Sequence, residues 1–187
     1  MDRRVALAGT VEPLGREAPL AVESAWGTFG SFWSEAGLAA LLYPAPDHIF
    51  RRSSDGRVRR LEQELTEYLA GRLRTFETPL APVGTSFQRR IWAEVCRIPY
   101  GQARTYTQVA AACGSGAAAR AVGGANGANP LPILIPCHRL VGSDGRLRGY
   151  GGGLEMKRRL LEMESGYAAK RTLSTGQHEP APVCSPT

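Results

Sequence analysis

The sequence is poor in cysteine, and its cysteines lie in no pattern that would bind zinc or form a disulfide framework. Only four occur among 187 residues, at Cys96, Cys113, Cys137 and Cys184, with long spacings and no C-x-x-C pair. A run of about 18 apolar residues, which a membrane helix needs, is also absent. The apolar stretch near the start is too short for a signal peptide. We therefore expect reduced thiols, no bound metal, no membrane span and a cytoplasmic location, or a nuclear one in a eukaryote.

Acidic residues are fewer than basic ones. There are 17 Asp and Glu against 23 Lys and Arg, and the formal net charge is +6. A basic excess in a chain of this size suits a polyanionic partner such as nucleic acid, although a solvated basic surface has the same composition. With 43% hydrophobic residues, the chain has enough apolar side chains for one sizeable core or two small ones.

The first half of the chain combines short β-like segments with one helix. After a loose leader at residues 1–17, a three-stranded meander is predicted over residues 20–26, 28–33 and 38–43. A helix ending at Gly71 is expected next, because apolar residues recur at helical spacing at Val58, Leu61, Leu65, Tyr68 and Leu69. The extended segment that follows places a domain boundary near residue 80, which makes residues 18–79 an N-terminal domain.

Short helices separated by glycine-containing turns are expected in residues 80–166. Thr85 and Thr105 can each cap a helix, and the second of these is short and runs from Tyr106 to Cys113. Another helix is expected from residue 117 to about residue 126, and the glycine turn between the two predicts a helix-turn-helix.

The expected helix at residues 117–126 is unusually poor in large side chains. It consists mainly of alanine and glycine, and Arg120 is its only long side chain. Small residues let a helix come close to another surface, which can be a neighbouring helix inside the protein or an external partner. The pattern by itself leaves both interpretations open.

The apolar run at residues 131–136 leads directly into Cys137, His138 and Arg139. A reactive thiol needs an imidazole neighbour and nearby positive charge, because cations lower the pKa of the thiol and the thiolate is the nucleophile. A free cysteine is more often buried and inert. The tripeptide alone therefore does not decide between a nucleophile and a core residue.

A glycine-rich loop, one more helix and a polar tail complete the sequence. The loop at residues 149–153 lacks the pattern of a phosphate-binding P-loop, and its glycines are expected to let it fold close over a pocket. The helix is predicted from about Leu154 to Glu164, with Gly166 as its stop. The polar, proline-rich residues 167–187 are expected to be a disordered tail.

Several motifs in this half resemble, in order and spacing, those of the O6-alkylguanine-DNA alkyltransferases, also called methylated-DNA–protein-cysteine methyltransferases. The central motif is Ile135-Pro136-Cys137-His138-Arg139. Those before it are Phe87-Gln88-x-x-Ile91-Trp92, Ile98-Pro99-Tyr100-Gly101, Thr105-Tyr106, Ala119-Arg120-Ala121-Val122-Gly123-x-Ala125 and Asn129-Pro130. Those after it are Gly149-Tyr150-x-x-Gly153-Leu154 and Lys157-x-x-Leu160-Leu161-x-x-Glu164. The resemblance covers about residues 80–166, whereas residues 20–78 resemble the family's variable N-terminal domain only loosely.

The resemblance implies an α+β fold. Residues 18–79 would form a small antiparallel sheet with a helix, of ribonuclease-H-like type. Residues 80–166 would form a mostly helical catalytic and DNA-binding domain with a helix-turn-helix. The implied activity is direct reversal of DNA damage, in which an alkyl group moves irreversibly from O6-alkylguanine to a cysteine of the protein after nucleotide flipping. O4-alkylthymine is left open as a second substrate. The implied protein is a monomer without a cofactor, and its partner is double-stranded DNA that contains O6-alkylguanine.

The resemblance also implies the roles of four catalytic residues. Cys137 would accept the alkyl group, and His138 would act as its base through a bound water molecule. Glu164 would orient His138, which gives a Cys-His-Glu relay. Asn129 would brace the turn before the active-site segment.

Substrate and DNA contacts are implied at further positions. Tyr106, Tyr150, the backbone at Gly151 and the carbonyl of Leu140 would surround the guanine. Arg120 would enter the base stack in place of the flipped nucleotide. The DNA backbone would be contacted at Thr107, Ser115 and Ser143, with Tyr106 helping to rotate the nucleotide. Gly151 stands where some relatives carry serine, so only a backbone donor is left there.

Two other interpretations of the sequence are weighed against the transferase. One is a non-catalytic protein that uses the same scaffold to bind DNA lesions, and the other is a helix-turn-helix regulator in which Cys137 is a core residue. Relatives of the first kind lack the acceptor cysteine, and the second leaves Glu164 and the Cys-His-Arg tripeptide unexplained. The combination of Cys137, His138, Asn129 and Glu164 therefore favours the transferase.

Overall fold

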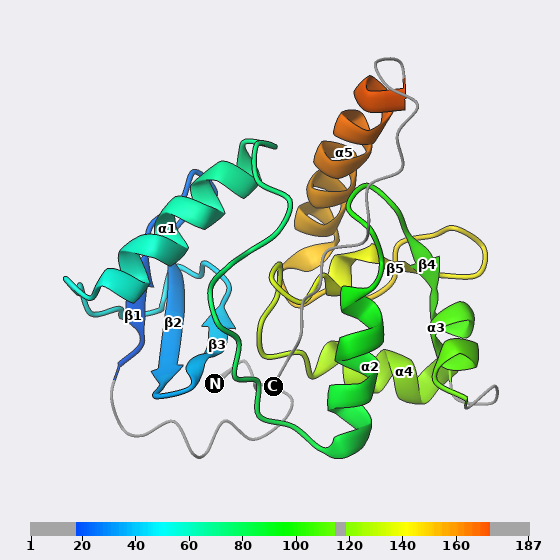
Figure 1. The fold of residues 1–187 in the computed structure, drawn as a ribbon, viewed down its shortest axis with the longest axis horizontal. Helices are drawn as coiled ribbons and strands as arrows, with labels where there is room; N and C mark the ends of the chain where they lie inside the picture. Colours follow the sequence, from blue (N-terminus) through cyan, green and yellow to red (C-terminus); the bar gives the residue numbers. More distant parts are fainter. Residues whose placement is uncertain (1–17, 115–118, 173–187) are drawn as a thin grey trace.

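The computed structural model describes residues 18–114 and 119–172. Figure 1 shows two halves side by side, a sheet covered by one helix and a group of helices and loops. This arrangement confirms the expected α+β class, with strands confined mainly to the first half. No helix in the described part of the chain is long and apolar enough to cross a membrane.

The N-terminal half is the predicted three-stranded meander. Strands β1 (Leu20–Val22), β2 (Phe29–Ser34) and β3 (Gly37–Leu42) pair antiparallel in this order. The first strand is shorter than expected. The side chain of Ser24 folds the chain into a turn, because its hydroxyl accepts from the backbone N–H of Trp26 at 3.1 Å and donates to the carbonyl of Gly27 at 2.7 Å.

Helix α1 (Gly56–Leu69) covers the sheet, as its apolar periodicity predicts. Asp55 caps its first turn by accepting a hydrogen bond from the backbone N–H of Arg57. Its buried face carries Val58, Leu61, Leu65 and Tyr68. The last of these, Tyr68, lies at the border with the second half of the molecule.

The second half contains the two helices of the predicted helix-turn-helix, whereas residues 115–118 between them lie outside the described residues. Helices α2 (Ser86–Cys96) and α3 (Tyr106–Ala112) each begin with a capping box, formed by Thr85 with Gln88 and by Thr105 with Gln108. Helix α4 (Ala119–Gly127) packs against both of them. The short strands β4 (Arg104–Thr105) and β5 (Leu140–Val141) pair in parallel beside α3.

Helix α5 (Gly153–Thr172) corrects one prediction, because it does not stop at Gly166. A glycine ends a helix when it takes a left-handed conformation. Gly166 is not among the glycines with positive φ, and a glycine inside a helix costs only about 1 kcal/mol. Residues 167–172, which were assigned to the tail, therefore continue the helix.

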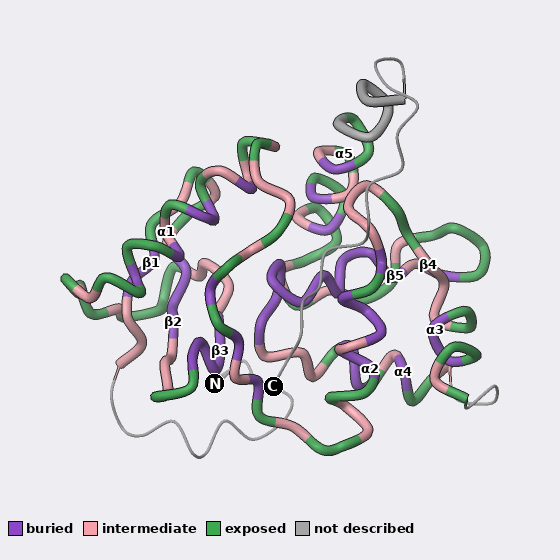
Figure 2. The backbone as a smooth tube through the Cα atoms, viewed as in Figure 1, coloured by how far each residue is buried: buried purple, intermediate pink, exposed green. Residues whose placement is uncertain are grey.

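The two halves are joined through backbone pairing and a shared core. The segment before α2 runs along β3, where the N–H of Leu38 donates to the carbonyl of Pro79 and the N–H of Ala81 donates to that of Leu38, both at 2.8 Å. A single cluster of buried apolar side chains extends from Val22 in β1 to Leu160 in α5. Figure 2 shows these buried stretches on the inner sides of both halves. The expected boundary near residue 80 is thus a strand-like connection packed against the sheet.

Candidate active site

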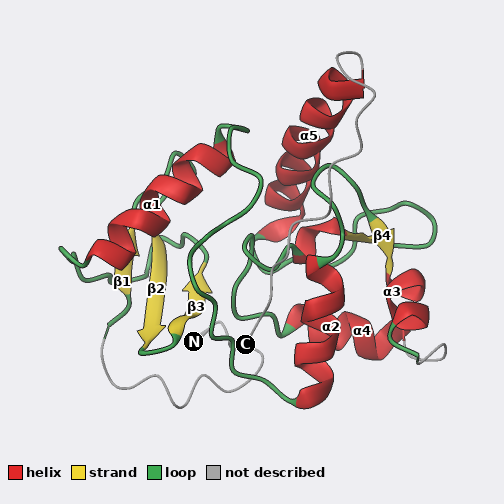
Figure 3. Ribbon diagram, viewed as in Figure 1, coloured by secondary structure: helices red, strands yellow, loops and turns green. Residues whose placement is uncertain are grey.

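Cys137 belongs to the segment between α4 and α5. Figure 3 shows that most of this segment is loop. It begins a buried 3-10 turn, η1 (Cys137–Arg139), and is only 4% exposed. The turn before it is held by Asn129, whose Nδ2 donates to the carbonyl of Ile135 at 2.9 Å and whose Oδ1 accepts from the N–H of Leu131 at 3.0 Å. Within this turn Ile133 has a φ of 74°, which a β-branched residue rarely adopts. Surrounding contacts therefore hold the backbone that leads into Cys137 in a strained conformation.

The environment of the Cys137 thiol has opposing effects on its pKa. Burial raises the pKa of Cys137, whereas a hydrogen bond from Asn129, the charge of Lys157 and a hydrogen bond from Tyr43 lower it. The cation is itself buried, and burial lowers the pKa of Lys157 to about 8. Its Nζ donates to the carbonyl of Arg148 at 2.8 Å. The thiolate is thus costly to form in this position, and the groups around it reduce that cost.

Behind the thiol, His138, Arg139 and Glu164 form a buried polar cluster. Oε1 of Glu164 lies 3.0 Å from Nε2 of His138 and accepts from Nη2 of Arg139 at 2.9 Å. Burial raises the pKa of Glu164, but its partners His138 and Arg139 outweigh burial and hold the pKa well below its usual range. Burial lowers the pKa of His138 despite the carboxylate beside it. The cluster therefore holds an ionised Glu164, a cationic Arg139 and a neutral imidazole.

The tautomer of His138 follows from its partners. Because Nε2 faces the carboxylate, it carries the proton and donates, which leaves Nδ1 as an acceptor. Nδ1 is buried and has no hydrogen-bond partner among the described residues. The imidazole is thus oriented with its basic nitrogen available for a proton.

Helix α1 supplies one member of this cluster that the sequence did not indicate. The hydroxyl of Tyr68 donates to Oε1 of Glu164 and lies 3.3 Å from Nε2 of His138. The backbone N–H of Gly101 donates to Oε2 of Glu164 at 3.1 Å. In the sequence, Tyr68 was visible only as one of the apolar residues on the buried face of its helix.

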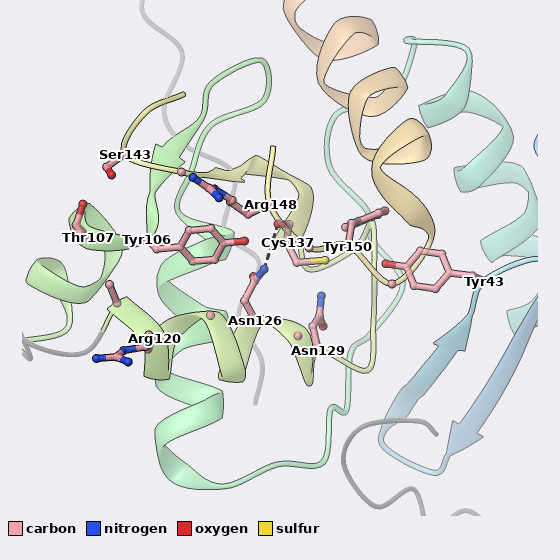
Figure 4. Close-up of a pocket in the computed structure, with 16 residues that line it drawn as sticks. Tyr43, Tyr106, Thr107, Arg120, Asn126, Asn129, Cys137, Ser143, Arg148 and Tyr150 are labelled. Atoms are coloured by element: carbon pink, nitrogen blue, oxygen red, sulfur yellow. Dashed lines mark hydrogen bonds between the residues drawn. The ribbon is translucent and has the colours of Figure 1, made fainter. Parts of the chain in front are cut away.

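Cys137 forms part of the wall of a pocket of about 540 Å³ (Figure 4). This is within the range of small-ligand sites and large enough for a nucleobase. The walls come from α3, α4, the loop after β5 and the end of the N-terminal sheet. Lining residues are Tyr43, Tyr106, Thr107, Ala119, Arg120, Gly123, Asn126, Gly127, Asn129, Cys137, Gly142, Ser143, Arg148, Gly149, Tyr150 and Gly151.

Most of the residues expected at the site lie in this pocket. Tyr106, Tyr150 and Gly151 line it, and Figure 4 shows the two tyrosines near Cys137. Thr107 on α3, Arg120 on α4 and Ser143 after β5 are exposed at its rim. These three come from separate elements, so the fold gathers them on one surface.

Three expected residues in the described part of the chain do not line the pocket, among them His138 and Glu164, which lie in the buried cluster behind the thiol. Leu140 is fully buried in β5 and does not line the pocket, although its carbonyl was expected to read the base. Ser115 lies outside the described residues.

Asn126, at the end of α4, is a pocket residue that the sequence did not indicate. Its Nδ2 donates to the carbonyl of Cys137 at 3.3 Å, and its side chain is a hydrogen-bond partner of Tyr106. Its position in a helix of small residues gave no sign of this contact. No group of three or more His, Cys, Asp or Glu side chains in the described part is arranged to hold a metal ion.

Comparison with known proteins gives consistent matches. A family model described as the DNA binding domain of 6-O-methylguanine DNA methyltransferase matches residues 86–166. A methylated-DNA–protein-cysteine methyltransferase of Methanosarcina barkeri is 49% identical over 106 residues, which are 57% of this chain and 67% of that protein. One from Mycobacterium tuberculosis is 50% identical over 105 residues, which are 56% of this chain and 64% of that protein.

A similar structure extends the match to both halves. The crystal structure of Mycobacterium tuberculosis OGT in complex with DNA aligns with a TM-score of 0.72 at 37% identity, covering 81% of this chain and 94% of that one. The chain belongs to the methylated-DNA–protein-cysteine methyltransferase family. Within this family, the sequence match is confined to about two thirds of the curated relatives' length, and the structural match includes the N-terminal half.

Proposed function

We propose that this chain repairs alkylated DNA by moving the alkyl group of O6-alkylguanine to Cys137. The observation that carries the proposal is the placement of Cys137 in the wall of a base-sized pocket. The next residue in the chain is His138, which is buried and paired with Glu164. A proton acceptor with a fixed tautomer next to a thiol is the arrangement of an activated nucleophile. The family model covers residues 86–166, which include Cys137, His138 and Glu164, and the OGT structure aligns with 81% of the chain.

The proposed reaction is a displacement at carbon. The thiol proton passes through a water molecule to Nδ1 of His138, and Glu164 and Arg139 hold the imidazole in place. The thiolate then attacks the alkyl carbon, the bond from that carbon to O6 breaks, and the electron pair remains on the guanine. The base takes up a proton, and Tyr106 donates to the ring as negative charge develops. The product is a thioether at Cys137, which is a poor leaving group, so each molecule would act once.

The DNA would approach over α4. Arg120 and Gly124 are neighbours on one exposed face, one helical turn apart. A Cβ added at Gly123 or Gly124 would meet no other atom within 4 Å, so internal packing does not require glycine at either position. This favours the external partner over close packing inside the protein. A helix face with small side chains and one arginine suits the minor groove, where an inserted side chain can replace a flipped nucleotide.

The substrate would be double-stranded DNA that contains O6-alkylguanine, bound by a monomer without a cofactor. The alternative is a lesion-binding protein that does not react. Cys137 favours the transferase, because a protein that only binds has no use for a nucleophile in the pocket.

The test is incubation with duplex DNA that contains O6-methylguanine, followed by mass spectrometry of the cysteine-containing peptides. We expect one methyl group on the peptide of Cys137, none on those of Cys96 or Cys113, and a yield of one equivalent. Cys137→Ala should transfer nothing and still bind DNA. A methylated Cys96 or Cys113, or product beyond one equivalent, would overturn the proposal.

Arg120→Ala tests the presentation of the base. If Arg120 fills the space left in the duplex, its loss should slow transfer from duplex DNA at least tenfold, yet change the reaction with free O6-benzylguanine little. Single-turnover rates on both substrates measure this. An equal loss on both would contradict insertion into the stack.

A further inference from the structure

Tyr43, which directly follows strand β3, lies in the pocket although it belongs to the N-terminal half. Figure 4 shows its ring reaching across from the sheet, with the hydroxyl directed at the sulfur of Cys137. The two residues are 94 positions apart in the sequence, and no motif links them. The pocket is therefore completed by a side chain from outside the part of the chain that carries its other walls.

The ring of Tyr43 is held in place by close packing. It makes an edge contact with Tyr150, with ring centroids 5.3 Å apart and planes inclined by 71°. A Cβ added at Gly151 would come within 2.7 Å of Cε2 of Tyr43, and one at Gly152 would come within 2.7 Å of its Cδ1. The two glycines thus leave the room that this ring occupies. Any side chain at position 151 would press directly on Tyr43.

The hydroxyl of Tyr43 acts on the thiol as a donor. Burial raises the pKa of Tyr43 far above its usual value, and the proximity of Cys137 adds to the rise. The phenol therefore stays protonated over the working pH range. Its hydrogen bond favours the thiolate and lowers the pKa of Cys137.

Other groups also face the thiol from the surrounding elements. Asn129 donates from the loop after α4, and Lys157 contributes positive charge from α5. Tyr106 on α3 and Tyr150 in the glycine loop also interact with the sulfur, and the pKa of each is raised by burial first and by Cys137 second. Tyr43 is the one hydroxyl among these whose hydrogen bond to the thiol lowers the pKa of Cys137.

We propose that Tyr43 is a catalytic residue of the alkyl transfer, and that the N-terminal domain completes the active site by supplying it. Its hydroxyl stabilises the thiolate of Cys137 and holds the sulfur toward the base. The part that concerns alkyl transfer rests on the proposed function. The part that concerns the thiolate does not, since it follows from the contact itself.

The size of the effect follows from the loss of one hydrogen bond to a charged group. Such a loss should raise the pKa of Cys137 by about 1 unit, which reduces the thiolate fraction about tenfold below the pKa. A more basic thiolate is also a better nucleophile, by about threefold per unit. Removing the hydroxyl should thus slow the reaction of Cys137 with a small electrophile about threefold at low pH and accelerate it about threefold at high pH.

The experiment compares the full-length protein with Tyr43→Phe, which keeps the ring and removes the hydroxyl. Alkylation by iodoacetamide is followed across pH, with mass spectrometry of the Cys137 peptide and with Cys113 as an internal reference. Thr28→Val is the matched control, because it removes one hydroxyl from the residue directly before β2, where Thr28 donates to the exposed Glu23. The pH at which the alkylation rate of Cys137 is half its maximum gives the midpoint of the profile. We expect this midpoint to rise by about 1 pH unit in Tyr43→Phe and to stay unchanged in the control. An unchanged midpoint in Tyr43→Phe would overturn the assignment.

Gly151→Ala gives a second test that does not touch Tyr43. The added methyl group should displace the ring, so the midpoint should rise in the wild-type background but not in Tyr43→Phe. Equal shifts in both backgrounds would show that Gly151 acts independently of the hydroxyl and would contradict the proposal. Thermal unfolding shows whether each variant remains folded.

The two proposals fail in different ways. If iodoacetamide shows the shift but methylated DNA yields no methyl group on Cys137, the contact stands and the proposed function fails. If the wild type takes up the methyl group, Tyr43→Phe should reduce the single-turnover rate at neutral pH more than threefold without weakening DNA binding. A normal rate in that variant would overturn the catalytic role of Tyr43.

Discussion

At the scale of single residues, Glu164 connects the most groups around the candidate site. Its carboxylate accepts from Tyr68, Gly101, His138 and Arg139, and it is completely buried. A buried charge is tolerated only when partners replace its hydration. Removing the charge would therefore affect both the orientation of His138 and the stability of the protein.

Glu164→Gln should destabilise the protein by about 3–5 kcal/mol, because it leaves Arg139 buried without a counter-ion. Urea unfolding measures the change. Glu155→Gln on the same helix is the control, since Glu155 is exposed and pairs with Arg158 on the surface. A change as small as that of the control would show that the buried pair contributes little.

The same variant should show a defined pH dependence. The pKa of Glu164 is lower in the folded state than the unfolded value of about 4.3, so the stabilisation is fully present above that pH. It is lost as the pH falls toward the folded-state pKa. The difference in free energy of unfolding between wild type and Glu164→Gln should therefore be constant near neutral pH and shrink below about pH 4. A difference that grows on acidification would contradict an ionised Glu164.

At the scale of elements, α4 combines weak helix propensity with an exposed face of small residues. Gly123, Gly124 and Gly127 each leave open space where a Cβ would stand. Glycine lowers helix stability by about 0.5–1 kcal/mol relative to alanine. Since no neighbouring side chain in the described part of the chain requires these glycines, the DNA partner proposed above would account for their cost.

Gly124→Ala should therefore have opposite effects on stability and on binding. The free energy of unfolding should rise by up to about 1 kcal/mol, while affinity for duplex DNA should fall several-fold. Gly56→Ala at the start of α1 is the control, because its Cβ would also meet open space, on a different element. Thermal unfolding and fluorescence anisotropy with labelled DNA measure the two quantities. Unchanged DNA affinity would remove this face from the proposed interface.

At the scale of the whole molecule, the N-terminal half is part of the site. Tyr43 lines the pocket, Tyr68 donates to Glu164, and the segment before α2 is paired with β3. These contacts, together with the shared core, make separate unfolding of the two halves unfavourable.

The protein should accordingly unfold in one transition. Trp26 and Trp33 report on the N-terminal half and Trp92 on the C-terminal half. In Trp92→Phe, and in the double variant Trp26→Phe with Trp33→Phe, the fluorescence midpoint should coincide with the far-UV circular dichroism midpoint of the same protein. Separate midpoints in either variant would show that the halves are independently stable.

Local sequence patterns determined the elements. Thr85 and Thr105 were recognisable as caps because a threonine hydroxyl satisfies the free N–H groups of a first turn, and both cap their helices. The meander, α1 and the helix-turn-helix followed from apolar spacing and glycine turns in the same way. The stop at Gly166 failed because a glycine ends a helix only if its backbone turns left-handed, which its identity alone does not dictate.

Tertiary structure decided which distant groups meet. The residue types of the Cys-His-Arg tripeptide and their resemblance to a family of transferases were enough to single out Cys137, His138, Asn129 and Glu164 from the sequence. Tyr68 and Glu164, however, are 96 positions apart, and Tyr43 follows a strand in the other half of the molecule. Their contacts arise from packing of the sheet and α1 against the C-terminal half, and no local spacing encodes such packing. The sequence therefore indicated the proposed nucleophile and three residues proposed to act with it, and only the fold showed which side chains of the N-terminal half contact them.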